Sequence, residues 1–266
     1  MSGRLFSALL KYWRGRRGLS QLDLALHAGV SARHVSFLES GRAQPGEGMV
    51  LRLFGALDVP LRDQNEGLRA AGFERRFAEP ELAAIDPRVE EAIARMMRQH
   101  EPYPLTVISP DADVLRSNRA ANVLFPAFVA EPERLVSPLN MFSLVFDPRL
   151  MRPFVSNWEA VARQMLARLH RETLHRPGSA RHAALCERVL RYPGVPPAWR
   201  EPDFTLDVEP TFTIRLRRGD VAVGFFTAIT VFSSPRQVTL EELRIESCFP
   251  LDAETVRYCE AFAVPL

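Results

Sequence analysis

Residues 20–41 read SQLDLALHAGVSARHVSFLESG, and this stretch decides the fold of the region around it. Ser20 is a favourable N-cap and Gly29 a favourable helix end, so the pattern predicts a short helix between them. Ser31 then caps a second short helix. Ala25 is small where two such helices cross closely, and Gly29 suits a turn whose left-handed backbone costs other residues about 1 kcal/mol or more. The spacing predicts a helix-turn-helix.

The flanking sequence extends this helical pattern in both directions. Apolar residues recur at helical spacing over residues 5–16, and two further short helices fit residues 49–57 and 61–71. The breaker at residues 58–60 separates the last two, and Gly72 closes the set. The sequence therefore predicts an all-α unit of five helices.

Charge is distributed unevenly along the chain. The net charge of +2 divides into +5 for residues 1–76 and −3 for the remainder. Apart from Lys11, the basic residues are arginines, which suit bidentate contacts to phosphate and guanine but are also what a GC-rich genome encodes. The basic end is the expected nucleic-acid end.

Beyond residue 76 the pattern changes to mixed α/β. Residues 74–86 are charged and interrupted by prolines, which indicates a hinge, and residues 87–100 form an amphipathic helix. We expect a DNA-binding domain at 1–76, a hinge and connecting helix at 77–100 and a second domain at 101–266. In that domain the sequence predicts an α+β fold with an antiparallel sheet. Its expected strands are 105–108, 114–117, 211–217, 221–232 and 243–249, and its expected helices 119–125, 150–169 and 180–191.

Composition excludes several classes of protein. No apolar run approaches the roughly 18 residues of a membrane-spanning helix, and the N-terminus lacks a signal-peptide core, so we expect a cytoplasmic protein without membrane partners. The cysteines, Cys186, Cys248 and Cys259, are too few and too scattered to indicate a disulfide framework or a zinc cluster. We expect neither a metal nor a cofactor.

Several short motifs in the first 72 residues resemble the Xre and lambda-repressor-like family of DNA-binding regulators. They are residues 14–21 (RGRRGLSQ), 29–31 (GVS), 38–42 (LESGR) and Pro45. The resemblance implies a five-helix lambda-repressor-like domain that binds an operator in double-stranded DNA. It also implies an internal ion pair between Arg14 and Glu39, which ties the first helix to the recognition helix.

Within that resemblance, the candidate DNA contacts gather on the second helix of the motif. The family pattern implies that Gln21 contacts phosphate and that the base-facing positions lie on the helix after Ser31. Ala32 and Phe37 cannot hydrogen-bond a base edge, so direct readout is expected mainly from Arg33 and Ser36. Arg33 is the expected guanine contact, with a phosphate contact as its alternative. The full set of expected DNA-binding residues is Gln21, Ser31, Ala32, Arg33, His34, Ser36, Phe37 and Arg42.

The second domain resembles the ligand-binding domain of MmyB-like regulators, which is PAS-like in fold. The matching pieces include Pro-Tyr-Pro at 102–104, Arg-Ser-Asn at 116–118, Asn-Met-Phe at 140–142, Asn-Trp at 157–158 and Leu-Arg-Ile-Glu at 243–246. The resemblance implies a small, mostly apolar ligand such as a fatty acid. Aromatic side chains are the expected pocket lining, with an ordinary aromatic core as the alternative. The expected ligand-binding residues are Phe142, Phe146, Phe154, Trp158, Phe212 and Phe226.

Two other functions remain as alternatives. The first is an enzyme, and two observations argue against it. His170 and His175 are five residues apart, so they point to different faces of a helix, and the sequence contains no catalytic motif or phosphate-binding glycine loop. An adaptor or antitoxin-like protein would use the second domain only for dimerisation, and would show a solid core with a large apolar surface patch. Whatever the second domain does, a single helix-turn-helix buries too little surface to select one genomic site. We therefore expect the protein to bind DNA as a homodimer.

Overall fold

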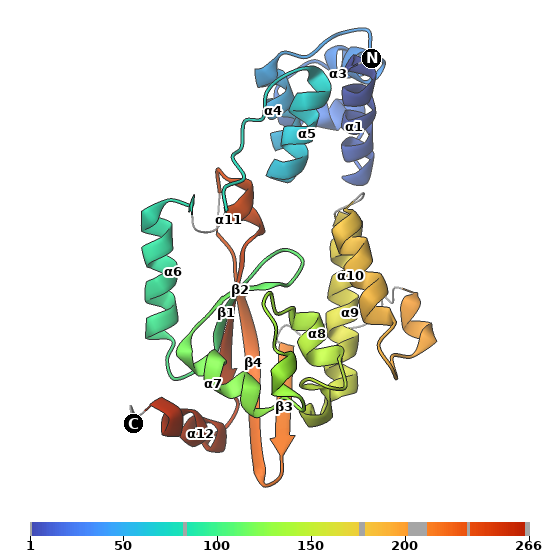
Figure 1. The fold of residues 1–266 in the computed structure, drawn as a ribbon. Coiled ribbons are helices and arrows are strands. Elements are labelled where there is room, and N and C mark those ends of the chain that lie inside the picture. Colours follow the sequence, from blue (N-terminus) through green and yellow to red (C-terminus); the bar gives the residue numbers. More distant parts are fainter. Residues whose placement is uncertain (1, 82–83, 176–178, 202–211, 233–234, 264–266) are drawn as a thin grey trace. The chain divides into compact units, whose positions relative to one another are not determined.

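The computed structural model describes residues 2–81, 84–175, 179–201, 212–232 and 235–263, and the chain divides into two compact units (Figure 1). The N-terminal unit comprises Met1–Ala84 together with Phe232–Glu241. The C-terminal unit comprises Ile85–Val231 and Glu242–Leu266. The chain therefore passes between the two units three times.

The N-terminal unit contains the five helices that the sequence predicts, and the expected all-α fold is confirmed. Their inner faces form one apolar core that includes Phe6, Leu24, Val35, Leu53 and Leu68. The helices are α1 (Ser2–Arg16), α2 (Gln21–Ala28), α3 (Ala32–Glu39), α4 (Glu47–Ala56) and α5 (Leu61–Ala71).

Local signals fix the turn between α2 and α3. Ser20 and Asp23 form a reciprocal capping box at the start of α2, which satisfies two free backbone N–H groups. Gly29 ends α2 with φ 62°, the left-handed conformation that favours glycine. Ser31 caps α3 by accepting a hydrogen bond from the backbone N–H of His34. The turn angle therefore follows from residues within about twelve positions of one another.

A polar network joins α1, α2 and α3. Arg14 donates to both carboxylate oxygens of Glu39, from Nε at 2.6 Å and from Nη2 at 3.0 Å. Its Nη1 donates to the backbone oxygen of Leu19 at 2.7 Å, and Gln21 Nε2 donates to Glu39 Oε2 at 2.8 Å. The Glu39 side chain is 4% exposed. Hydrogen bonding to Glu39 raises the pKa of Arg14, so the guanidinium keeps its charge. The implied ion pair is therefore present in this structure.

The N-terminal unit also includes a segment from far along the chain. Helix α11 (Val238–Glu242) follows residues 235–237, and these residues contact the end of the helical domain. The backbone N–H of Val238 donates to Ala78 O at 3.0 Å, and Thr239 Oγ1 donates to Pro80 O at 2.6 Å. Glu241 accepts a hydrogen bond from the backbone N–H of Leu61 at 2.8 Å, at the start of α5. These contacts join segments far apart in the chain and could not be predicted from local sequence.

The C-terminal unit is built on an antiparallel sheet with strand order β2-β1-β5-β4-β3, which confirms the expected α+β fold. Successive side chains of each strand point to opposite faces, so the register decides which residues meet on each face. The strands are β1 (Leu105–Ile108), β2 (Val114–Ser117), β3 (Phe212–Arg218), β4 (Val221–Thr230) and β5 (Arg244–Pro250).

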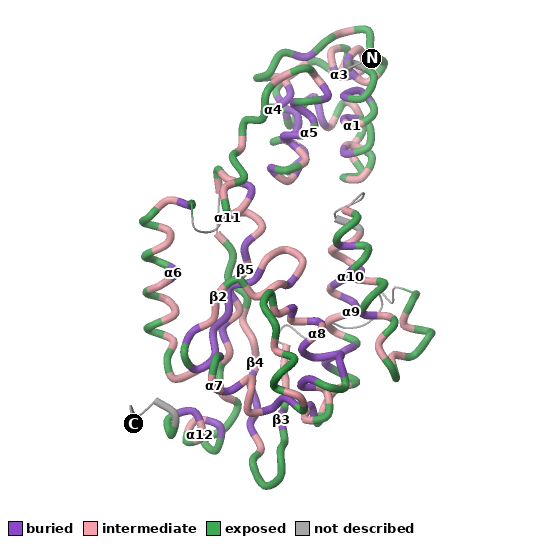
Figure 2. The backbone as a smooth tube through the Cα atoms, in the orientation of Figure 1, coloured by how far each residue is buried: buried purple, intermediate pink, exposed green. Residues whose placement is uncertain are grey.

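Helices pack against this sheet and against one another. Helix α9 packs against β3 and beside α8, while α12 packs against α7, β4 and β5. All four residues of β1 are buried, and so are most residues of α8 (Figure 2). The helices of this unit are α6 (Pro87–Gln99), α7 (Arg119–Ala127), α8 (Met141–Phe146), α9 (Trp158–His175), α10 (Ala180–Leu190) and α12 (Ala253–Ala263).

The long helix expected at residues 150–169 is placed differently by the structure. A short 3-10 turn occupies Arg152–Phe154, and Val155 forms a bridge to Leu216 of β3. The helix begins only at Trp158, after Asn157 has used its side chain to hydrogen-bond β3 at Thr213 O and Arg215 N. Pro153 suits the turn, because proline is tolerated in a first turn and cannot continue the hydrogen bonding of a helix. Helices α8, α11 and α12 were not predicted from the sequence.

The Arg14–Glu39 pair gives a prediction for the stability of the N-terminal unit. Arg14→Ala leaves the Glu39 carboxylate buried with only the Gln21 donor, so we expect this unit to lose about 3 kcal/mol of unfolding free energy. Native-state hydrogen exchange of the α2 and α3 amides measures this locally. Arg33→Ala, the same substitution at an exposed position, is the control and should change exchange by less than about 0.5 kcal/mol. Equal exchange in the two variants would show that the pair does not stabilise the unit.

Candidate DNA interface and ligand cavity

The exposed face of α3 presents an aromatic ring with two guanidinium groups over it. Phe37 is half-buried, and the guanidinium carbon of Arg33 lies 5.2 Å from its ring centroid. The guanidinium carbon of Arg42 lies 6.0 Å from the same centroid. Among the described residues neither guanidinium has an ion-pair partner. The arrangement places two unpaired positive charges beside each other at the end of the helix-turn-helix.

The other expected DNA-contacting residues lie on or beside α3. Ser31 is exposed at the N-cap, while Ala32, His34 and Ser36 are half-buried along the helix. Gln21, at the start of α2, donates to Glu39. The structure therefore brings the expected set together around one helix, and assigns to Gln21 a bond within the protein that the sequence analysis did not include.

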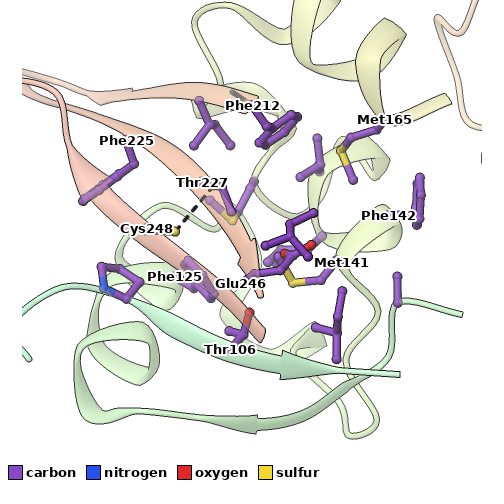
Figure 3. A pocket seen from close by; sticks show the side chains of 18 of the residues that line it. Thr106, Phe125, Met141, Phe142, Met165, Phe212, Phe225, Thr227, Glu246 and Cys248 are labelled. Carbon is purple, nitrogen blue, oxygen red and sulfur yellow. Dashed lines mark hydrogen bonds between the residues drawn. The ribbon is translucent and has the colours of Figure 1, made fainter. Parts of the chain in front are cut away.

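The C-terminal unit contains a cavity of about 530 Å³. It lies between the face of the sheet that carries Phe225 and the helices α7, α8 and α9 (Figure 3). Its volume is within the range of sites for small organic ligands, about 300 to 1,000 Å³. Most of its wall is apolar, with Leu124, Phe142, Met165 and Ile214 among the lining residues.

Strand alternation determines which residues form the sheet side of the cavity. The residues of β4 that line it include Phe225, Thr227 and Ile229, two positions apart. The register pairs Thr227 with Cys248 and Ile229 with Glu246, so the inward residues of β5 continue the same face. Each of these residues lines the cavity.

The wall also carries a group of charged side chains. Arg168 of α9 donates to Glu172 at 2.9 Å and to Glu246 at 3.2 Å. Burial raises the pKa of Glu246, although Arg168 acts in the opposite direction. Burial lowers the pKa of Arg168, but its two carboxylate neighbours outweigh that effect and the net change is upward. The guanidinium of Arg168 is thus a permanent cation held between two acidic groups.

Of the six expected ligand-binding residues, Phe142 and Phe212 line the cavity. Phe146 is fully buried and packs edge-on against Trp158, whose Nε1 donates to Val145 O at 3.1 Å. Phe154 lies under the Arg218 guanidinium, and Phe226 stacks on Phe249 on the opposite face of the sheet. These four side chains are not among the residues that line the cavity, and we do not include them in the proposed site.

Burial and hydrogen bonding shift the pKa of two thiols and one imidazole in the C-terminal unit. Burial raises the pKa of the Cys248 thiol to about 12, and that of Cys259 to about 11, so both thiols are protonated near neutral pH. Buried His182 has a raised pKa through its hydrogen bond to Asp111, and its other ring nitrogen meets Leu169 O. Among the described residues there is no group of three or more His, Cys, Asp or Glu side chains that could hold a metal ion.

The polar residues of the cavity wall were not predicted from the sequence. Thr106, Gln164, Arg168, Glu172 and Glu246 all line it. A signal was available, because Gln164, Arg168 and Glu172 recur every four residues and therefore share one face of a helix. Glu246 lies two positions from Cys248 and therefore on the same face of the expected strand.

Comparison with known protein families agrees with both halves of this description. The family model for a helix-turn-helix matches residues 10–64, and the model described as MmyB-like transcription regulator ligand binding domain matches residues 89–261. A search of the curated proteins finds no match to this chain. No described helix is long and apolar enough to cross a membrane. The second model covers more than half of the sequence, and the chain therefore belongs to the MmyB-like transcription regulators, with a helix-turn-helix DNA-binding region followed by a ligand-binding domain.

Proposed function

We propose that this regulator recognises an operator in duplex DNA through α3, and that a small, largely apolar ligand in the cavity controls this recognition. The observation that carries the proposal is the cavity of about 530 Å³ with its mostly apolar wall. A domain that served only dimerisation would need no such space, so the cavity favours a sensor over an adaptor. Fatty acids are the ligand class that the family resemblance implies.

The DNA-binding half of the proposal rests on Arg33, Arg42 and Phe37. Two guanidinium groups that have no ion-pair partner in the described part of the chain supply positive charge for phosphate and donors for guanine. The ring below them limits their freedom before DNA binds. We propose that Arg33 contacts a base edge and that Gln21 contacts the backbone. We also propose that the protein acts as a homodimer, because one recognition helix reads too few base pairs to select a site.

The control half of the proposal needs a connection between the cavity and the helix-turn-helix. Strands β4 and β5 line the cavity, and the segment between them includes α11, which belongs to the N-terminal unit. The hinge at residues 74–86 and helix α6 provide a second covalent route. A ligand regulates DNA binding only if its affinity differs between the DNA-competent and incompetent arrangements. Both routes could carry such a difference.

Arg33→Ala tests the assignment of base readout. Loss of a bidentate guanine contact costs about 1 to 3 kcal/mol on the preferred site and relaxes selection at one base pair. Gln21→Ala should weaken binding to all duplexes alike, since a phosphate contact carries no sequence information. The measurement is site selection from a random duplex pool, followed by affinities on the selected and scrambled sites. Arg95→Ala, which removes an exposed charge in the other unit, is the control. Unchanged selection by Arg33→Ala would assign Arg33 to the backbone.

The contacts of α11 allow a test of whether this helix couples ligand binding in the cavity to DNA binding. We expect an apolar probe such as decanol to change the affinity for the selected duplex, and the duplex to change the affinity for the probe by the same factor. Thr239→Ala combined with Glu241→Ala removes two of the hydrogen bonds that hold α11. In this double variant the coupling factor between probe and duplex should move towards one, while the probe alone and the duplex alone still bind. Glu254→Ala, an exposed acid on α12, is the control. Titration calorimetry with and without the partner measures all four affinities. A coupling factor that survives the double variant would exclude α11 as the route.

A further inference from the structure

The polar part of the cavity wall is organised by two elements. On the sheet, Thr106 of β1 pairs with Glu246 of β5, which pairs in turn with Ile229 of β4, so the three lie in one row. Opposite them, α9 presents Gln164 and Arg168 one turn apart. Figure 3 shows Thr106, Glu246 and Met141 close together on this wall. The row lies near the C-terminal end of β4, after which the chain continues to α11.

The charge of this region is not favourable to an anion. Arg168 is the only basic residue among the described residues that line the cavity, and it is already shared by Glu172 and Glu246. With all three ionised, the group carries one net negative charge. If Glu246 takes up a proton the group is neutral, and Arg168 still faces Glu172. In neither state does the group carry a net positive charge that would attract a ligand carboxylate.

Three polar groups of the wall lack a hydrogen-bond partner in the described part of the chain. They are the Thr106 hydroxyl, the Gln164 side-chain amide and the Oε2 atom of Glu246. Thr106 is 2% exposed and the Glu246 side chain 13%, so solvation of both is limited. Buried polar groups of this kind are costly unless they are paired, and a charged acceptor gains most from a donor.

We propose that the cavity takes an amphiphile with an apolar chain and a non-anionic, hydrogen-bond-donating head, such as an alcohol, an amide or an amine, and that it selects against carboxylates. The head donates to Glu246 Oε2 and meets Thr106 and Gln164, while the chain occupies the apolar remainder of the cavity. A fatty acid would bring another carboxylate beside Glu246 and would lose its hydration in a group that carries no net positive charge. This inference rests on the proposed sensing function and names the ligand chemistry of the same cavity.

The test compares three probes of equal chain length on the full protein. Decanol, decylamine and decanoate are titrated by calorimetry at pH 8, below the concentrations at which they form micelles. We expect decanol and decylamine each to bind at least about tenfold more tightly than decanoate. Decanoate binding as tightly as decanol would overturn the inference and leave the sensing function intact. Failure of all three to bind would overturn the sensing function, and the inference with it.

Two variants locate the head group. Glu246→Gln removes the negative charge, so decylamine should lose most of its affinity and the gap between decanol and decanoate should shrink several-fold. Gln164→Leu leaves the Arg168 ion pairs in place and should weaken decanol several-fold, which keeps the test valid if Glu246→Gln folds poorly. Glu159→Gln, on the same helix but outside the cavity, should change none of the three affinities. An unchanged ranking of the probes in both cavity variants would overturn the placement of the head.

Discussion

The ligand cavity depends on one constraint, the register between β4 and β5. The pairs Thr227–Cys248 and Ile229–Glu246 place alternate residues of both strands on the cavity face. A slip of one residue would turn the whole inward set of a strand to the other face. It would take Glu246 away from Arg168, which would then keep only Glu172 as a partner. The same ion pair that gives the cavity its polar wall therefore also opposes a shift of register.

These two strands also form one of the chain's passages between the units. β4 ends at Thr230, and β5 begins at Arg244 after α11 has hydrogen-bonded to Ala78 and Pro80. Ile229 and Glu246 are therefore within a few residues of the chain segment that belongs to the N-terminal unit. A ligand group in contact with Glu246 acts on backbone that is close in sequence to α11. A ligand confined to the wall near Leu216 and Phe225 would act much further from it.

How much of the molecule the sequence could predict depends on the range of the interactions. The turn at Gly29 and the caps at Ser20 and Ser31 are set by neighbours in sequence, and the helix-turn-helix was predicted from them. The strands were also predicted, to within one or two residues at most ends, because alternation is local. The position of α11 could not be predicted in this way, because its partners are about 160 residues earlier in the chain.

The cavity residues were harder to predict than the strands, for a related reason. Phe225 and Phe226 are adjacent, and only the parity of β4 decides that Phe225 lines the cavity while Phe226 stacks on Phe249. Composition favours both equally. Parity is fixed by pairing with β5 and by what covers each face, which are interactions across the fold. An aromatic residue in a strand is therefore a weak indication of ligand contact until its face is known.

On the DNA-binding side, Phe37 and Gln21 gain roles that their chemistry alone does not suggest. Phe37 cannot hydrogen-bond a base, but its ring lies under Arg33 and Arg42, and ordering two long side chains before binding reduces the entropy lost on binding. Gln21 donates to Glu39, which is compatible with a phosphate contact because an amide nitrogen carries two hydrogens. One hydrogen can hold the Arg14–Glu39 pair while the other faces the backbone. The network that stabilises the fold would then also fix the direction of a DNA contact.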